Sequence, residues 1–486
     1  MSRTGFVTIL CACIGLSSAC SMQEFGFERD EREIEFERDG QDYIDSTRQK
    51  YEVNSGGTLT VDAKLGAIRI RSSINDEVDV LVRKRFRATD ADQVRKAFSN
   101  IEVVIKQTYN GVRIEVDQIR YPTYRKWFWQ DDWPDRVYVE INVMVPEEYN
   151  LDLITISGDI QTGNIAGNVT AETLTGNIAT DPIRGNLRIK SNSGNIETSR
   201  VVGSVHTTTL TGNIEIGPVD GELTVSSNSG RIKTGTVEED LHAKTLSGNI
   251  EIGPVDGDAT VGSNSGRINT GTVAGDLHAK TLSGNIETGP VDGDATVSSA
   301  TGRTKTGTVE GDLHAKTLTG KIEIGPVDGD ANVSTTSGMI EASNVLGVCE
   351  TRSLSGDIRL GPTRGDIVAS STSGDIEGEL IVTDPSVEAR YDMQTLSGDI
   401  TIQMPVDIPS VIDAQITIGE IIDPWLPNWW HVQRRIKSDF DLNFSRIESS
   451  PGNYAIKAIG ETNGGGNRIK LVSTAGNIRI RSKDDE

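Results

Sequence analysis

The sequence SGNIEIGPVDGDATVGSNSGRINTGTVAGDLHAKTL, residues 247–282, returns almost unchanged at residues 283–318. A Ser-Gly or Thr-Gly pair recurs in and around these copies at a constant 18-residue step, from Ser157 to Ser373. A fixed period of this length indicates a repeat architecture. This stretch therefore decides the fold, and the flanking segments are expected to adapt to it.

Within each copy, apolar and polar residues alternate. Val255 and Ala259 share one phase, and Asp256 and Asp258 share the other. Such alternation in short β-branched segments, interrupted by Gly, Pro, Asn and Asp, predicts strands with one buried face. We predict a mostly β fold: a parallel β-solenoid (β-helix) of 18-residue coils, each with two short strands that stack on the neighbouring coils.

Stacked coils should preserve the residue type at steps of 18. At about 4.8 Å per coil, the array from Ser157 to Ser373 would be about 58 Å long. Two columns meet the requirement: an apolar one (Ile214, Ile232, Ile250, Ile268 and Ile286) and a hydroxyl one (Thr173, Ser191, Thr209, Ser227, Thr245, Ser263, Thr281, Ser299 and Thr317).

Another column alternates between leucine and asparagine. Its members stand an even number of positions from the inward residues Ile250 and Ile252, so the period-two alternation predicts that they also point inward. Two interpretations stay open: a buried asparagine ladder among leucines, which needs hydrogen-bond partners, or a 36-residue coil. We prefer an 18-residue coil and a 36-residue duplication unit. The corners also stay open between Gly-Pro and the tripeptides Ser-Gly-Asn and Asp-Gly-Asp. The alternating column is Leu174, Asn192, Leu210, Asn228, Leu246, Asn264 and Leu282.

Residues 1–20 have the features of a lipoprotein-type signal peptide. Arg3 precedes an apolar core, Phe6–Leu16, which is too short for a membrane span, and small residues lead to Cys20. We expect export to the cell envelope and lipidation of Cys20, with an outer-membrane anchor on the periplasmic or external face. Simple cleavage after Ala19 is the alternative, because Leu16 stands four residues before the cysteine rather than the usual three.

Four further segments follow the signal. Residues 21–50 are densely charged and predict a solvated tether. Residues 51–150 alternate as strands around one short helix, 90–100, and predict an N-terminal β-rich (α+β) capping domain. Residues 151–404 form the solenoid array, and residues 405–486 a β C-terminal capping region. Caps are expected because the open ends of an array expose unpaired strand edges.

The formal net charge of −23 argues against nucleic acid and against direct binding to acidic membrane surfaces. A lipid anchor would therefore supply the contact with the membrane. With Cys20 acylated and the signal removed, Cys349 is the remaining cysteine, so a disulfide framework within the mature chain is excluded.

One loop, residues 121–135, is rich in aromatic residues. Clustered aromatics in a loop are a candidate interface. The alternative is that they pack on the solenoid or on the C-terminal cap. The candidate interface residues are Tyr124, Trp127, Phe128, Trp129 and Trp133.

Two columns of titratable residues are candidate metal ligands. The histidines His206, His242, His278 and His314 recur at a 36-residue step, about 9.6 Å apart, which is too far to share one ion, so we assign them to the surface. Stacked aspartates would repel, and calcium between coils would relieve this. However, the Gly-Gly-x-Gly-x-Asp pattern of calcium-binding rolls is missing and Asp is an ordinary turn residue. Calcium is therefore a secondary prediction, and no other cofactor is expected; its ligands would be Asp240, Asp258, Asp276, Asp294, Asp312 and Asp330.

Three features then coincide: an export signal, the entry segments Gly57-Thr-Leu-Thr-Val and Leu65-Gly-Ala-Ile-Arg-Ile, and the repeated Ser-Gly-Asp/Asn-Ile. Over about residues 55–480 the chain resembles the bacterial "putative adhesin" β-strand-repeat family, a domain of unknown function in cell-envelope proteins. The resemblance implies a β-solenoid and an envelope location, and it supplies no catalytic residues.

The sequence contains no nucleophile–base pairing, phosphate loop or zinc spacing that would indicate an enzyme. We expect a non-enzymatic, adhesin-like envelope protein whose repeats act as a scaffold or as a multivalent surface for a polysaccharide or an envelope protein. One alternative is a carbohydrate-active β-helix enzyme, a polysaccharide lyase or hydrolase, with its site near Trp127–Trp133. The other is a purely structural spacer.

Overall fold

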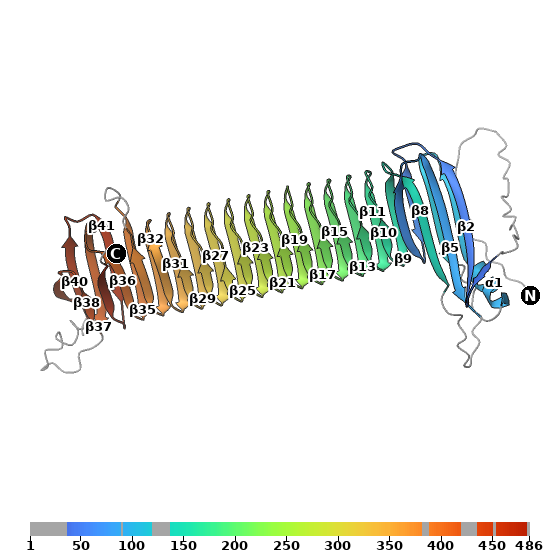
Figure 1. The fold of residues 1–486 in the computed structure, drawn as a ribbon. Coiled ribbons are helices and arrows are strands. Elements are labelled where there is room, and N and C mark those ends of the chain that lie inside the picture. The colour runs from blue at the N-terminus through green and yellow to red at the C-terminus, as the bar shows by residue number, and fades with distance from the viewer. Residues whose placement is uncertain are drawn as a thin grey trace, which may run out of the picture.

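A computed structural model describes residues 36–88, 91–118, 137–381, 388–418, 435–450 and 453–483. These residues form a long rod of stacked strands that is closed at each end by larger strands (Figure 1). Two sheets run along the whole length of the described rod, and each sheet continues from the array into both ends.

Each coil contains one long strand, one short strand and one bridging residue. In a central coil these are Val237, β19 (Leu241–Ser247) and β20 (Ile250–Ile252). Each pairs in parallel with its equivalent in the next coil, so that Ile250 lies beside Ile268. This confirms the predicted parallel β-solenoid and establishes the 18-residue coil.

The long strands have seven or eight residues each and form the second sheet. They are β9 (Asn150–Ser157), β11 (Val169–Thr175), β13 (Leu187–Ser193), β15 (Val205–Thr211), β17 (Leu223–Ser229), β19, β21 (Ala259–Ser265), β23 (Leu277–Ser283), β25 (Ala295–Thr301), β27 (Leu313–Thr319), β29 (Ala331–Ser337), β31 (Cys349–Ser355), β33 (Ile367–Ser373) and β35 (Arg390–Ser397).

The short strands form the first sheet and mostly have three residues. They are β10 (Ile160–Thr162), β12 (Ile178–Thr180), β14 (Ile196–Thr198), β16 (Ile214–Ile216), β18 (Ile232–Thr234), β20, β22 (Ile268–Thr270), β24 (Ile286–Thr288), β26 (Thr304–Lys305), β28 (Ile322–Ile324), β30 (Ile340–Ala342), β32 (Ile358–Thr363), β34 (Ile376–Leu380) and β36 (Ile400–Pro405).

The core is a set of inward columns between the two sheets. Leu241, Ala243 and Thr245 of β19 point inward and are at most 2 % exposed. Part of the hydroxyl column reaches the corner glycine one coil earlier: Ser263 Oγ donates to the carbonyl of Gly248 at 3.1 Å, and Ser299 Oγ to that of Gly284 at 3.1 Å. Thr245 Oγ1 and Ser227 Oγ are buried without a hydrogen-bond partner among the described residues. Burying a hydroxyl beside aliphatic columns is tolerable when it is hydrogen-bonded in this way.

The alternating leucine–asparagine column is not buried, and the inward phase predicted for it is wrong. Leu246 is 44 % exposed, whereas its neighbour Thr245 is buried. The Ser-Gly-Asn corner explains why the prediction fails. Thr245 and Ile250 both point inward although they stand an odd number of positions apart, so the alternation shifts by one residue at the corner between them. Counting back from Ile250 across the corner therefore gives the wrong side for Leu246. A buried asparagine ladder is not needed.

The coil has three corners, and all the predicted turn sequences are used. Ser-Gly-Asn joins the long strand to the short one, Gly-Pro leads to the bridging valine, and Asp-Gly-Asp leads to the next long strand. The ladder donors on either side of Pro254 are the nitrogens of Gly253 and Val255. The proline nitrogen thus falls at a position where no ladder hydrogen bond has to be donated.

The Ser-Gly corner requires glycine for two reasons. Gly212 has φ of 138°, a conformation that L side chains rarely adopt, and a Cβ there would lie 2.0 Å from the carbonyl oxygen of Gly194 in the previous coil. The close approach of consecutive backbones at this corner leaves no space for a side chain.

The N-terminal cap extends both sheets with the strands predicted over residues 51–150 and with two more, β1 and β2, that were not predicted. In the first sheet the order is β1 (Glu37–Asp39), β2 (Asp42–Glu52), β5 (Glu77–Arg87), β8 (Tyr138–Pro146), β4 (Ala67–Ser73) and then β10. In the second it is β6 (Ile101–Thr108), β7 (Gly111–Gln118), β3 (Thr58–Ala63) and then β9. Both sheets pass from parallel to antiparallel pairing before they end.

The helix α1 (Ala91–Ser99) lies at the predicted place and buries Val94, Ala97 and Phe98 in a small cluster with Tyr43 and Phe86. Tyr43 belongs to β2, so the prediction of a solvated tether over residues 21–50 is wrong for its last part. The alternating charges of β2 are explained by its place: it pairs along its full length with β5, and most of its side chains remain partly exposed.

The C-terminal cap closes the rod with an out-of-order insertion. The strands are β37 (Ser410–Ile418), β38 (Ile436–Ser438), β39 (Asn443–Ser450), β40 (Asn453–Thr462), β41 (Asn467–Ser473) and β42 (Ile478–Lys483). The last two, which carry the repeat-like end of the chain, insert between β35/β36 and β37/β38. Antiparallel strands β40 and β39 then end the second sheet.

The irregular step after Ser373 does not break the stack. Ser373 pairs directly with Ser397, so the additional residues of this step are accommodated between β34 and β35 while the register is kept.

Replacing Gly212 by alanine should destabilise the array, because the substitution combines an unfavourable φ with contact against a neighbouring backbone. We expect a cost of about 3 kcal/mol, seen as a lower melting temperature by circular dichroism. The matched control is Gly262→Ala in β21, where a Cβ would meet nothing within 4 Å; it should stabilise by about 0.5 kcal/mol. Equal effects of the two substitutions would contradict this account of the corner.

Candidate functional site

The outer face of the long-strand sheet is the most regular surface of the protein. Each long strand presents three side chains outward, which in β19 are His242, Lys244 and Leu246. The same triplet returns two coils later in β23 and four coils later in β27, and the coils between them carry smaller residues. We call this surface, formed by strands β13 to β29, the long-strand face.

Three columns make up the long-strand face, and their prominent members are exposed. The leucines are between 44 and 52 % exposed from Leu210 to Leu318. Lys244 has Gly262 beside it on the next coil, and Lys280 has Ser298. Each lysine therefore stands clear of its neighbours, at a spacing of two coils or about 9.6 Å.

The long-strand face contains no acid. From Leu187 to Ser337 the nine long strands have no Asp or Glu, although the chain has 71 acidic and 48 basic residues. Their charged residues are Arg188, Lys190, Lys244, Lys280 and Lys316, together with His206, His242, His278 and His314. The histidines are exposed, as the sequence predicted.

The short-strand sheet has the opposite character. Its outward column contains mostly glutamates, and its cations are paired: Lys233 donates to Glu215 at 2.8 Å, and Arg359 lies 3.3 Å from Glu377. The Lys233 hydrogen bond lowers the pKa of the Glu215 carboxyl. By contrast, no described carboxylate lies within 4.0 Å of Lys244, Lys280 or Lys316.

The surface that these lysines form was not predicted from the sequence. The signal was present in the 18-residue columns. The predicted burial of Leu246 hid this signal, because it removed one of the three residues that each long strand presents to the outside.

The aspartate column, predicted to hold calcium, forms a ladder at the Asp-Gly-Asp corner. Asp240 Oδ1 accepts the backbone N–H of Asp258 at 2.9 Å, and the pattern continues through Asp330 to Val348 at 2.8 Å. Asn150 and Asn168 accept in the same way in the first coils. Over the described ranges, no group of three or more His, Cys, Asp or Glu residues is placed to hold a metal ion, and calcium binding stays a prediction.

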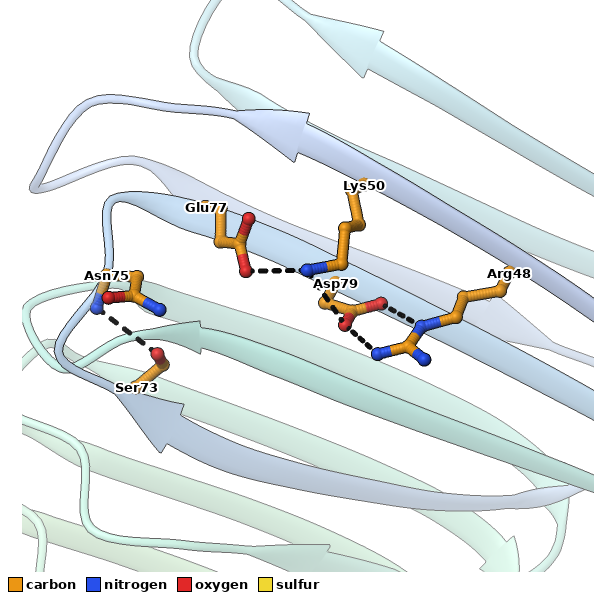
Figure 2. Close-up of polar contacts among 6 residues, drawn as sticks. All are labelled: Arg48, Lys50, Ser73, Asn75, Glu77 and Asp79. Carbon is orange, nitrogen blue, oxygen red and sulfur yellow. Dashed lines mark hydrogen bonds and ion pairs between the residues drawn. The ribbon is translucent and has the colours of Figure 1, made fainter.

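A second cluster of charges lies in the N-terminal cap, across strands β2 and β5 (Figure 2). Arg48 donates to the buried Asp79 from Nε at 3.0 Å, and Lys50 Nζ lies 2.9 Å from Glu77 and 3.6 Å from Asp79. The Arg48 hydrogen bond lowers the pKa of the Asp79 carboxyl despite its burial. These groups satisfy one another across the two strands, so the cluster stabilises the cap.

A cleft of about 530 Å³ opens beside this cluster, where Tyr149 and the turns around Asn54 and Asn110 meet. Its described lining is polar and includes Glu52, Asp76 and Glu77, but no histidine, cysteine or lysine. Glu77 is engaged by Lys50. Ser55 of the lining donates its hydroxyl to the Glu148 carboxylate.

Cys349 packs inside the array. It is fully buried on β31, and burial raises the pKa of its thiol to about 12. A thiol held in this protonated state does not act as a nucleophile at neutral pH.

The remaining predicted site residues lie outside the described ranges. They are the lipidation site Cys20 and the aromatic interface residues Tyr124, Trp127, Phe128, Trp129 and Trp133. No helix within the described ranges has the length and the apolar character that a membrane crossing requires.

Comparison with protein families finds one match. Residues 275–425 match the family described as Toastrack DUF4097. The matched range covers the coils from β23 to the first strand of the C-terminal cap, and it confirms the resemblance to a repeat family of unknown function. No curated protein matches the chain.

Several solved structures are similar over much of the chain at low identity. A "putative adhesin" from Bacteroides fragilis is 13 % identical, with 60 % of this chain and 96 % of that one covered and a TM-score of 0.20. A "putative cell adhesion protein" from Clostridium sporogenes is 10 % identical, with coverages of 90 % and 100 % and a TM-score of 0.15. A "putative adhesin" from Parabacteroides distasonis is 14 % identical, with coverages of 61 % and 96 % and a TM-score of 0.18. Because these scores are low, the fold assignment rests on the strand pairing of this chain.

Asp79 makes stability depend on pH. Its folded-state pKa lies below the unfolded value near 4, so the stabilisation is present above about pH 4 and is lost as the pH falls through the folded pKa. We expect the melting temperature of the wild type to fall in acid more steeply than that of Asp79→Asn. The exposed Asp62→Asn variant is the control and should follow the wild type. Parallel acid profiles for Asp79→Asn and wild type would contradict this assignment.

The aspartate ladder should tolerate asparagine but not alanine. Asparagine keeps the Oδ1 acceptor and removes stacked like charges, so the triple variant with Asn at 258, 276 and 294 should melt at or above the wild-type temperature in low salt. The triple alanine variant should lose about 0.5–1.5 kcal/mol per hydrogen bond. A melting temperature that rises with added calcium in the wild type, but not in the asparagine variant, would support the calcium prediction instead.

Proposed function

We propose that this chain is a non-enzymatic, adhesin-like protein of the cell envelope whose solenoid presents a repeated binding surface. The observation that carries the proposal is the long-strand face: one exposed triplet of side chains, recurring every two coils on a rigid stack. Repetition of one weak site gives avidity for a ligand that itself repeats, because every contact after the first is intramolecular.

The envelope location is proposed from the ends of the chain. Residues 1–20 support export and lipidation at Cys20. Antiparallel strands end both sheets at the N-terminal cap and the second sheet at the C-terminal cap, which supports a rod that does not polymerise end to end. A lipid at Cys20 would tether the N-terminal end of the rod to a membrane and leave the array free to extend from it. Mass analysis of the mature N-terminus from a fractionated native host measures this directly.

Binding without cleavage is the outcome that we expect from the full-length chain. Incubated with an array of neutral and acidic polysaccharides and with envelope extracts, it should retain a polymeric ligand and release no reducing ends. Shortening the ligand to a few sugars should weaken binding steeply, since avidity is then lost.

Two other outcomes would overturn the proposal. Release of reducing ends would favour the carbohydrate-active enzyme, and retention of no ligand by the folded chain would favour a structural spacer. The folded state is verified in the same samples by the melting curve of the array.

A further inference from the structure

We infer that the long-strand face binds a linear acidic polysaccharide that lies along the rod over the lysine and leucine columns. This inference rests on the proposed function and names the chemical class of the ligand. Five properties of the face support it: its charge, its free cations, the spacing of the lysines, the residues between the lysines, and its borders.

The charge of the long-strand face is opposite to that of the whole protein. The formal net charge is −23, yet nine consecutive long strands expose lysine, arginine and histidine without one acid. A surface that merely kept an acidic rod in solution would have no need to exclude carboxylates from one side. Electrostatic complementarity therefore favours an anionic partner at this face.

The cations of the long-strand face are free to bind an anionic ligand. On the short-strand sheet, Lys233, Lys305 and Arg359 each have a glutamate within 4 Å. Lys244, Lys280 and Lys316 have no such described partner, and small residues flank each of them on the adjacent coil. The same residue type is neutralised on one face and available on the other.

The spacing selects the kind of polyanion. The lysines recur every two coils, about 9.6 Å, which is close to the length of a disaccharide unit in an extended polysaccharide. A polymer with one carboxylate on every second sugar would therefore meet one lysine per repeat. Nucleic acid has a charge about every 3.4 Å along each strand, and this denser charge would also be repelled by the acidic remainder of the rod.

The intervening positions suit sugars rather than a purely ionic ligand. Beside each lysine stands an exposed leucine, such as Leu246 or Leu282, which offers apolar contact to the C–H face of a sugar ring. The coils between present Asn228, Asn264 or threonine and serine hydroxyls, which can hydrogen-bond to sugar hydroxyls.

The residues that border the long-strand face indicate which of its columns the polymer would follow. The aspartate ladder runs along the histidine side, at Asp240 and its equivalents, and would repel an anion. The leucine side is bordered by the Ser-Gly-Asn corner, where Asn249, Arg267 and Asn285 follow one another. The favourable track is thus the lysine and leucine columns rather than the histidine column.

The test compares two variants of the full chain with equal charge changes. The face variant is Lys244→Ser, Lys280→Ser and Lys316→Ser, which introduces the residue that Ser226 and Ser298 already supply in that column. The control variant is Lys233→Asn, Lys305→Asn and Arg359→Asn, on the short-strand sheet, where Asn269 already occurs. Hyaluronan, with one carboxylate per disaccharide, is the probe, and dextran and single-stranded DNA are the comparison ligands.

In biolayer interferometry we expect hyaluronan to bind the wild type more tightly than dextran or DNA, with an affinity that falls as salt rises. The face variant should raise Kd about tenfold, and the control variant less than about twofold. A third variant, Leu246→Asn, Leu282→Asn and Leu318→Asn, should weaken binding with little change in its salt dependence.

Four results would overturn the inference. Equal losses in the face and control variants would show attraction to overall charge, and tighter binding of DNA would assign another polymer. Loss of self-association in the face variant, measured by sedimentation of the protein alone, would assign a second copy of the chain to this face. Failure to bind any acidic polysaccharide, while another ligand is retained in the array experiment, would reject the inference and leave the proposed function standing.

Discussion

The structure depends on one constraint: each coil must lie directly on the equivalent residues of the previous coil, at the distance of a parallel β-ladder. The constraint is most severe at the Ser-Gly corner, where the backbones of successive coils come so close that a Cβ at Gly212 would overlap the carbonyl of Gly194. Glycine is present there in every regular coil because no other residue combines this φ with this proximity. Once the corner is fixed, the register of both strands follows.

Because the coils stack in register, each side chain lies beside the equivalent side chain of the next coil, and any favourable or unfavourable contact between them is repeated along the rod. Inside, this is favourable, because columns of isoleucine, valine and hydroxyl groups pack on their own kind and some of the hydroxyls, such as those of Ser263 and Ser299, donate to corner carbonyls. Outside, stacking would place like charges one coil apart. The protein meets this in different ways on its surfaces: aspartates accept backbone N–H groups, glutamates of the short-strand sheet alternate with paired cations, and lysines of the long-strand face appear only in every second coil.

This last arrangement gives the 36-residue duplication a physical meaning. The backbone repeats at every coil, but the outward triplet repeats after two coils, so the surface has twice the period of the backbone. A rod with a rigid core and a coarser external period is suited to a ligand whose own repeat is longer than one strand spacing. The caps are equally necessary, because the two long sheets would otherwise expose edges that recruit further strands.

The sequence alone determined the solenoid, its parallel pairing and most cap strands, because repetition at a fixed step leaves few other ways to bury Ile250 and Ile268 together. It could not determine which side of the long strand faces outward. The local alternation is interrupted at the corners, and only the three-dimensional path of Gly248 shows that Thr245 turns inward and Leu246 outward. Tertiary structure also decided that β2 joins the cap and that β41 and β42 insert between earlier strands, since pairing between segments distant in sequence leaves no periodic signal. The acid-free face became visible only when the outward phase was known, because a surface is a property of neighbouring coils and not of any one of them.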